Sequence, residues 1–127
     1  MLQELKNELS VIIAKTGIFF AKCDGYYDNR EQKFISNFLS KLSENNVITD
    51  DAKEILENLG NVDIRLDDII KDTNIFISKL GKQEQADFYH CMKDFIEGVI
   101  NADNITHQKE LENYEKWKNK IVMPAIS

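Results

Sequence analysis

The chain has 127 residues, and its hydrophobic fraction of 43% and charged fraction of 30% predict one globular domain that spans residues 1–127. A formal net charge of −6 without a basic patch argues against nucleic-acid binding, because the surface would repel phosphate groups. A single proline and five glycines disfavour a turn-rich β fold. The N-terminal apolar residues recur at helical intervals, so we expect neither a signal peptide nor a membrane span, and a cytoplasmic location.

The first amphipathic pattern predicts a helix from Leu2 to about Cys23, because its apolar residues follow the i, i+3, i+4, i+7 spacing of one helix face. Gly25 suits the left-handed conformation that ends helices. A second helix is predicted to follow Asp28, which forms a candidate capping pair with Glu31. The predicted buried face of this helix consists of Phe34, Ile35, Phe38, Leu39 and Leu42.

Further helices are predicted along the rest of the chain. The stretch ENNVITDDAKEILENLG indicates a polar loop and then a short helix that stops at Gly60. The next pattern ends at Gly81, a clear apolar stripe then runs from Phe88 to Ile100, and the last pattern ends before Pro124. No alternating pattern competes for a strand. The sequence therefore predicts an all-α, compact bundle of about six helices with short connections.

A single constant shift along the sequence relates the start of the chain to its end. The shift pairs the loop residues Asp24 with Asp103, Gly25 with Asn104, Asp28 with His107, and Glu31 with Glu110. Apolar positions that flank the loops also pair, namely Ile13 with Met92, Phe20 with Val99, Ile35 with Tyr114, Phe38 with Trp117, and Leu42 with Ile121. We therefore expect an internal duplication of a helix–loop–helix hairpin, at residues of about 2–43 and 83–122.

The duplicated loop resembles a motif of the TerB-like family of helical domains, which is named for a tellurite-resistance protein. That motif is a small residue, then Asp-Gly, then a Glu seven positions after the Asp, at a junction between two helices. CDGYYDNRE carries it in full, and ADNITHQKE carries it with Asn104 in place of the glycine. The resemblance covers nearly the whole chain in helix order.

The resemblance implies an all-helical fold, an association with stress response and tellurite resistance, and binding of a metal. It implies no catalytic mechanism, so we expect the protein not to be an enzyme. The family also includes the N-terminal domain of a membrane-linked co-chaperone. The resemblance therefore implies an unidentified protein partner in a membrane-associated complex, for a chain that does not itself span the membrane.

The two loops offer candidate ligands for a divalent metal ion at offsets 0, 4 and 7, namely Asp24, Asp28 and Glu31, and Asp103, His107 and Glu110. Carboxylates and backbone carbonyls are hard oxygen ligands that suit Ca²⁺, Mg²⁺ or Mn²⁺, and His107 would favour a softer metal in the second loop. An EF-hand is excluded, because its third and sixth positions, counted from Asp24, would be Tyr26 and Asn29.

A structural role accounts for the same residues. A carboxylate at the C-terminal end of a helix is unfavourable by roughly 0.3–1 kcal/mol, so Asp24 and Asp103 need a partner. The free N–H groups at the start of the following helix could be that partner. The acidic residues would then only shape the corners of a protein-interaction scaffold. A metal-dependent hydrolase is a weaker alternative, because no nucleophile or general base is grouped outside the loops.

Cysteine and histidine are the other residue types that could supply ligands or nucleophiles. Cys23 and Cys91 lie in apolar stripes without metal-type spacing, and we expect them to be buried free thiols. His90 belongs to one Asp-x-x-His sequence, whereas a di-iron bundle needs two Glu-x-x-His helices. We therefore expect His90 to be a partly exposed helix residue.

Overall fold

The structure, a computed structural model, describes residues 3–22, 29–45, 52–59, 64–102 and 108–121. The regular structure of these residues is entirely helical, which confirms the all-α prediction. The helices are α1 (Gln3–Lys22), α2 (Asn29–Glu44), α3 (Ala52–Leu59), α4 (Leu66–Ser78), α5 (Lys82–Asn101) and α6 (Gln108–Lys120). None of the described helices is both long enough and apolar enough to cross a membrane.

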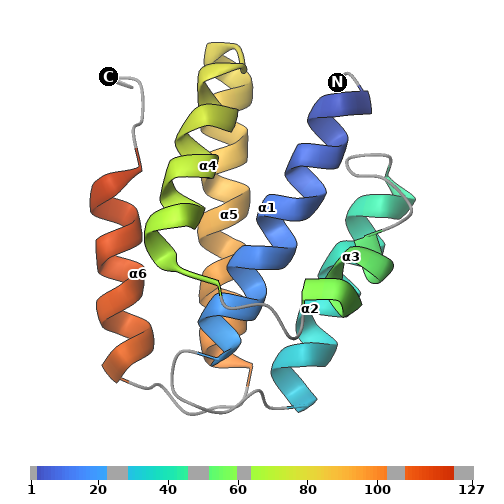
Figure 1. Cartoon of the computed structure of the whole chain (residues 1–127), viewed down its shortest axis with the longest axis vertical. Helices are drawn as coiled ribbons and strands as arrows, with labels where there is room; N and C mark the ends of the chain where they lie inside the picture. Colours follow the sequence, from blue (N-terminus) through green and yellow to red (C-terminus); the bar gives the residue numbers. More distant parts are fainter. Residues whose placement is uncertain (1–2, 23–28, 46–51, 60–63, 103–107, 122–127) are drawn as a thin grey trace.

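The helices form a bundle around α1, which contacts α2, α3, α4 and α5. Helix α2 also contacts α3 and α5, so these elements cover one side of the central pair (Figure 1). Helix α6 lies at the opposite edge, against α4 (Figure 1). The central position of α1 follows from its sequence, because apolar or small residues occupy more of its circumference than a surface helix requires.

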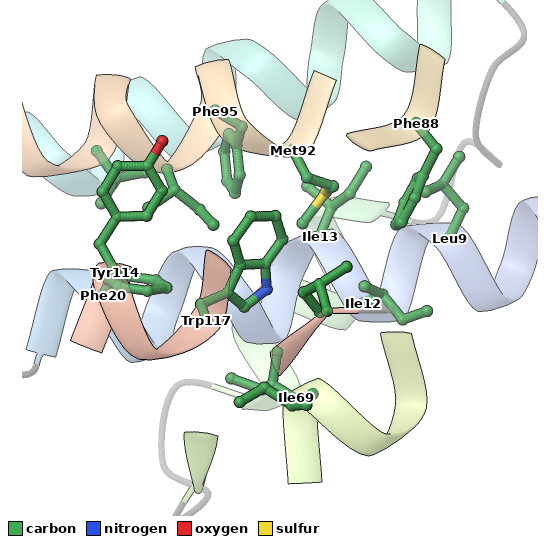
Figure 2. Packing of buried hydrophobic residues seen from close by; sticks show 14 of the residues in the cluster. Leu9, Ile12, Ile13, Phe20, Ile69, Phe88, Met92, Phe95, Tyr114 and Trp117 are labelled. Atoms are coloured by element: carbon green, nitrogen blue, oxygen red, sulfur yellow. The ribbon is translucent and has the colours of Figure 1, made fainter. Parts of the chain in front are cut away.

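The core is built mainly from the facing sides of α1 and α5. Ile13 and Phe20 of α1 and Phe95 of α5 are completely buried. Trp117 of α6 is completely buried in the same core (Figure 2). Tyr89 of α5 stacks on it, with ring centroids 5.8 Å apart. A buried aromatic side chain of this size contributes about 3–5 kcal/mol relative to alanine, so Trp117 contributes strongly to the docking of α6.

The connection between α4 and α5 is short and hydrogen-bonded. Helix α4 ends at Ser78, three residues before the predicted stop at Gly81, because the backbone there turns into i→i+3 bonds from Lys79 and Leu80. The side-chain amide of Gln85 donates to the carbonyl oxygens of Ile77 and Leu80, at 3.0 Å each. These bonds satisfy carbonyl groups that the end of a helix leaves open.

Two glycines allow α1, α2 and α5 to approach closely. A Cβ atom on Gly17 of α1 would lie 2.8 Å from Cζ of Phe95 and 3.1 Å from Cγ1 of Ile35. A Cβ atom on Gly98 of α5 would overlap the ring of Phe34. A glycine inside a helix costs roughly 0.5–1 kcal/mol relative to alanine, and the close ring packing explains why the chain has glycine at both positions.

The helix bounds repeat along the chain. Helices α1 and α5 are both 20 residues long, and the shift that pairs Asp24 with Asp103 carries both ends of α1 onto both ends of α5. The same shift carries the start of α2 onto the start of α6. Helix α6 is shorter, however, and it packs against α4, whereas α2 packs against α1 and α5. The duplication of the hairpin stays a prediction, and the two hairpins differ in the neighbours of their second helix.

We expect Gly17→Ala to lower the free energy of unfolding by about 1 kcal/mol, because overpacking costs about 1–3 kcal/mol and the gain in helix propensity is about 1 kcal/mol. Urea unfolding followed by circular dichroism measures it. Phe95→Leu replaces the ring that the new methyl group meets with a smaller side chain. The double variant Gly17→Ala, Phe95→Leu should therefore lose less stability than the sum of the losses in the single variants. A stabilised Gly17→Ala protein would contradict the close packing.

Candidate functional site

Of the six predicted metal ligands, Glu31 and Glu110 belong to the described part of the chain. Asp24, Asp28, Asp103 and His107 lie outside the described residues. The described part of the candidate site therefore consists of the two glutamates and of the helices that carry them.

Glu31 and Glu110 occupy the same place in their helices. Each is the third residue, in a helix that starts at Asn29 or at Gln108. Both helix starts lie at the end of the bundle where α1 and α5 terminate (Figure 1). At the third position, a carboxylate can reach back to the open N–H groups of the first turn, and the positive end of the helix dipole favours its charge.

Both glutamates are buried, with 1% of Glu31 and 0% of Glu110 exposed. Each continues the apolar stripe of its helix. Glu110 lies four residues before Tyr114 and seven before Trp117, and both aromatic residues are buried. Glu31 likewise lies four residues before Ile35 and eight before Leu39, which are completely buried. This spacing is a sequence signal that predicts burial of the two glutamates, whereas their position as candidate caps does not.

Glu84 shows how a glutamate in the same helix position looks when it acts only as a cap. It is the third residue of α5, and its Oε1 accepts a hydrogen bond of 3.2 Å from the backbone N–H of Gly81. Unlike Glu31 and Glu110, Glu84 is exposed. Capping therefore does not require burial in this protein.

The burial of two carboxylates has an energetic cost that capping does not offset. Moving a carboxylate into a protein interior costs several kcal/mol, even after the surroundings relax. The helix dipole typically stabilises such a charge by roughly 0.3–1 kcal/mol, and a capping hydrogen bond contributes about 1 kcal/mol. A glutamate buried at this position is therefore stabilised by more than a cap alone, that is, by several donors or by a cation.

Tyr114 lies one turn beyond Glu110 and links α6 to the core. Its ring meets Phe20 edge-on at 6.4 Å between centroids, and the Lys118 ammonium lies 4.5 Å from the centre of the ring. Burial of the phenol, followed by the negative charge of Glu97 on α5, raises the pKa of Tyr114 well above its usual range. The phenol is therefore a neutral group at physiological pH.

Cys91 and His90 are placed nearly as expected. Cys91 is a free thiol, but it is partly rather than fully buried, and Cys23 lies outside the described residues. Burial, followed by the charge of Asp94, raises the pKa of the Cys91 thiol, and a protonated thiol is a poor nucleophile. His90 is exposed on α5. Neither residue therefore resembles a catalytic group.

Among the described residues, no group of three or more His, Cys, Asp or Glu side chains could hold a metal ion. The predicted ligand sets would each be completed by two residues outside that part of the chain. Metal binding at the two corners therefore stays a prediction.

Comparison of the chain with models of known protein families, with curated proteins and with solved structures finds no match. The resemblance to the TerB-like family consequently rests on the two loop motifs and on the helix order, and it stays a prediction.

We expect Glu31→Ala and Glu110→Ala each to lower the free energy of unfolding by about 3 kcal/mol, because each change leaves buried polar groups without the carboxylate. Glu84→Ala is the matched control at the same helix position and should cost less than about 1 kcal/mol. Urea unfolding of the three variants measures the contrast. Equal costs at the buried and the exposed positions would show that burial adds nothing to the role of a cap.

We expect Tyr114 to make the stability of the protein sensitive to alkaline pH. The usual pKa of tyrosine, 10.0, applies to the unfolded chain, and the folded pKa is higher. The unfolded state therefore loses its phenolic proton first, and the contribution of Tyr114 falls as pH rises above about 10. Unfolding by urea between pH 8 and 11 should show a steeper loss for the wild type than for Tyr114→Phe. If the free energy of unfolding fell with pH equally in both proteins, the raised pKa of Tyr114 would be contradicted.

Proposed function

We propose that the chain is a non-enzymatic helical module of the TerB-like kind, and that each of its two corners holds a divalent cation. The observation that carries the proposal is the burial of Glu31 and Glu110 at the same position of two helices whose starts are related by the shift between the two hairpins. Two acidic groups buried at matching corners favour positive charge at both. A cation at each corner supplies that charge.

The proposal includes the internal duplication. It is supported by the equal lengths of α1 and α5, by the common shift between the helix starts, and by the buried residues that the shift pairs. Ile13 with Met92 and Phe20 with Val99 are completely buried on the first helix of each hairpin. On the second helix, Ile35 pairs with Tyr114, and both are buried. A duplicated hairpin would carry its cation site twice.

The donor set fits a hard cation. In the first corner, Asp24 and Asp28 would join Glu31, and in the second, Asp103 and His107 would join Glu110. Carboxylate oxygens are the ligands that Ca²⁺, Mg²⁺ and Mn²⁺ prefer, and the imidazole of the second corner favours a transition metal. A bound cation would neutralise the buried carboxylate and tie the end of one helix to the start of the next.

A scaffold role without metal is the second candidate. It is favoured by Glu84, which stabilises the start of α5 through one hydrogen bond to Gly81. Glu31 and Glu110 would then close their corners through several backbone donors instead of a cation. In that case the module would serve only to present its helices to a protein partner, as the family resemblance implies.

Thermal unfolding in the presence of metal ions separates the two candidates. The chelator-treated protein is titrated with Ca²⁺, Mg²⁺, Mn²⁺ and Zn²⁺. A cation that binds only the folded state raises the free energy of unfolding by about 2.7 kcal/mol when its concentration is a hundred times its dissociation constant. For a chain of this size, that corresponds to a rise in Tm of roughly 10 °C.

Variants locate the effect. Glu31→Gln and Glu110→Gln should each reduce the rise in Tm, and the double variant should abolish it, because the amide cannot neutralise the ion. Glu84→Gln, at the same helix position but exposed, should keep the full rise. If no ion at millimolar concentration shifts Tm while the buried variants are still destabilised, the metal proposal fails and the scaffold role is favoured.

A further inference from the structure

An apolar pocket of about 340 Å³ opens between α1, α4 and α5. Its apolar walls come from all three helices and from the last turn of α2, and they comprise Leu9, Ile13, Leu42, Phe76, Leu80 and Phe88. Figure 2 shows Leu9 and Phe88 next to each other where α1 and α5 face this space. The late position of Leu42 in α2 and the early position of Leu9 in α1 place the pocket away from the corners that carry Glu31 and Glu110.

Two carboxylates of α5, Glu84 and Asp87, also line the pocket, and both residues are exposed. They are the only charged residues among the described residues that line the pocket. One oxygen of Glu84 accepts from the N–H of Gly81, and one oxygen of Asp87 accepts from the amide of Gln83 at 3.1 Å. Both donors are neutral, so these bonds leave the two negative charges uncancelled at the mouth of an apolar cavity.

We infer that this pocket binds a small amphipathic cation, that is, an ammonium group attached to an apolar chain or ring. The volume lies at the lower end of the range for small-molecule sites, which are mostly apolar with a few polar groups that orient the ligand. The apolar tail would enter between Leu9 and Phe88, and the ammonium would remain beside Glu84 and Asp87. An ammonium near two carboxylates is favoured, whereas a fatty-acid carboxylate at the same place is repelled.

The inference is independent of the proposed cation sites, because it uses a different end of α1 and α2 and different carboxylates. Cys91 also lines the same pocket, so its thiol can report whether the pocket is occupied. Its pKa is raised by burial and by Asp94, so the thiol reacts slowly at neutral pH and more readily at pH 9. A ligand in the pocket would cover it.

Three ligands of equal chain length test the inference on the full chain by isothermal titration calorimetry at low salt. They are octylammonium, which keeps its charge at pH 7 as lysine does, the neutral octan-1-ol, and the anionic octanoate. We expect octylammonium to bind in a 1:1 ratio and about tenfold more tightly than octanoate, with octanol between them. Binding of octanoate as tight as that of octylammonium would overturn the inference, and so would the failure of octylammonium to bind.

Variants assign the charge effect to the mouth of the pocket. Asp87→Asn should weaken octylammonium binding about threefold and leave octanol unchanged, because one exposed carboxylate contributes modestly. Glu84→Gln keeps an oxygen that can accept from Gly81 and should behave alike. Glu57→Gln removes the same charge from an exposed position of α3 that does not line the pocket, and it should leave both affinities unchanged. An equal loss in the Glu57 variant would overturn the assignment.

Protection of Cys91 gives a readout that needs no variant. Alkylation by N-ethylmaleimide at pH 9, followed by peptide mass mapping, should slow at Cys91 at least threefold when octylammonium saturates the protein. The rate at Cys91 in a parallel sample with the same concentration of octanoate serves as the reference. Unchanged alkylation of Cys91 under saturating ligand would place the bound molecule elsewhere and overturn the inference.

Discussion

The close packing of α1 against α5 is the constraint on which the other contacts of this fold depend. Gly17 lets Phe95 and Ile35 approach the backbone of α1, and the same ring of Phe95 packs against Phe38 of α2 in a tilted arrangement, at 4.6 Å between centroids. Helices α3 and α4 then pack on α1, and α6 reaches the core through Trp117. A shift of the central pair by the width of one methyl group would therefore be felt by every layer around it.

Four carboxylates of this acidic protein lie in two places with different chemistry. At one end, Glu31 and Glu110 are buried. A charge in the protein interior is unfavourable, so nearby donors or an ion must stabilise it. Near the start of α5, Glu84 and Asp87 are exposed to solvent beside the apolar walls of the pocket. Their charges carry no desolvation penalty there and can select the ligand. The proposals for the two ends follow from this difference in burial rather than from the residue type.

Much of the fold could be predicted from the sequence, because helix periodicity and helix stop signals are local. The stripe from Phe88 to Ile100 predicted α5, and Gly25 predicted a stop close to Lys22, where α1 ends. The end of α4 was predicted too late, because the backbone changes to i→i+3 bonds from Lys79 and Leu80 before the chain reaches Gly81.

The candidate site was less accessible from the sequence. The capping positions of Glu31 and Glu110 could be read directly, whereas their burial follows from the helices packed around them. The apolar pocket combines residues of four helices that are distant in the sequence. Neither its volume nor the position of Glu84 and Asp87 at its mouth follows from any local pattern. Prediction therefore succeeded where the cause lay within one helix and ended where packing between helices decided the outcome.

The single tryptophan of the chain lies in α6, at the edge of the bundle. Its emission consequently reports whether α6 is docked, while far-ultraviolet circular dichroism reports helix content throughout the bundle. Helix α6 lies at the edge and contacts fewer helices than α1 does, so it is a natural unit of sub-global opening. Coincident transitions by the two probes would mean that the edge helix and the central pair unfold as one cooperative unit. Separated transitions would mean that α6 undocks before the rest of the bundle unfolds.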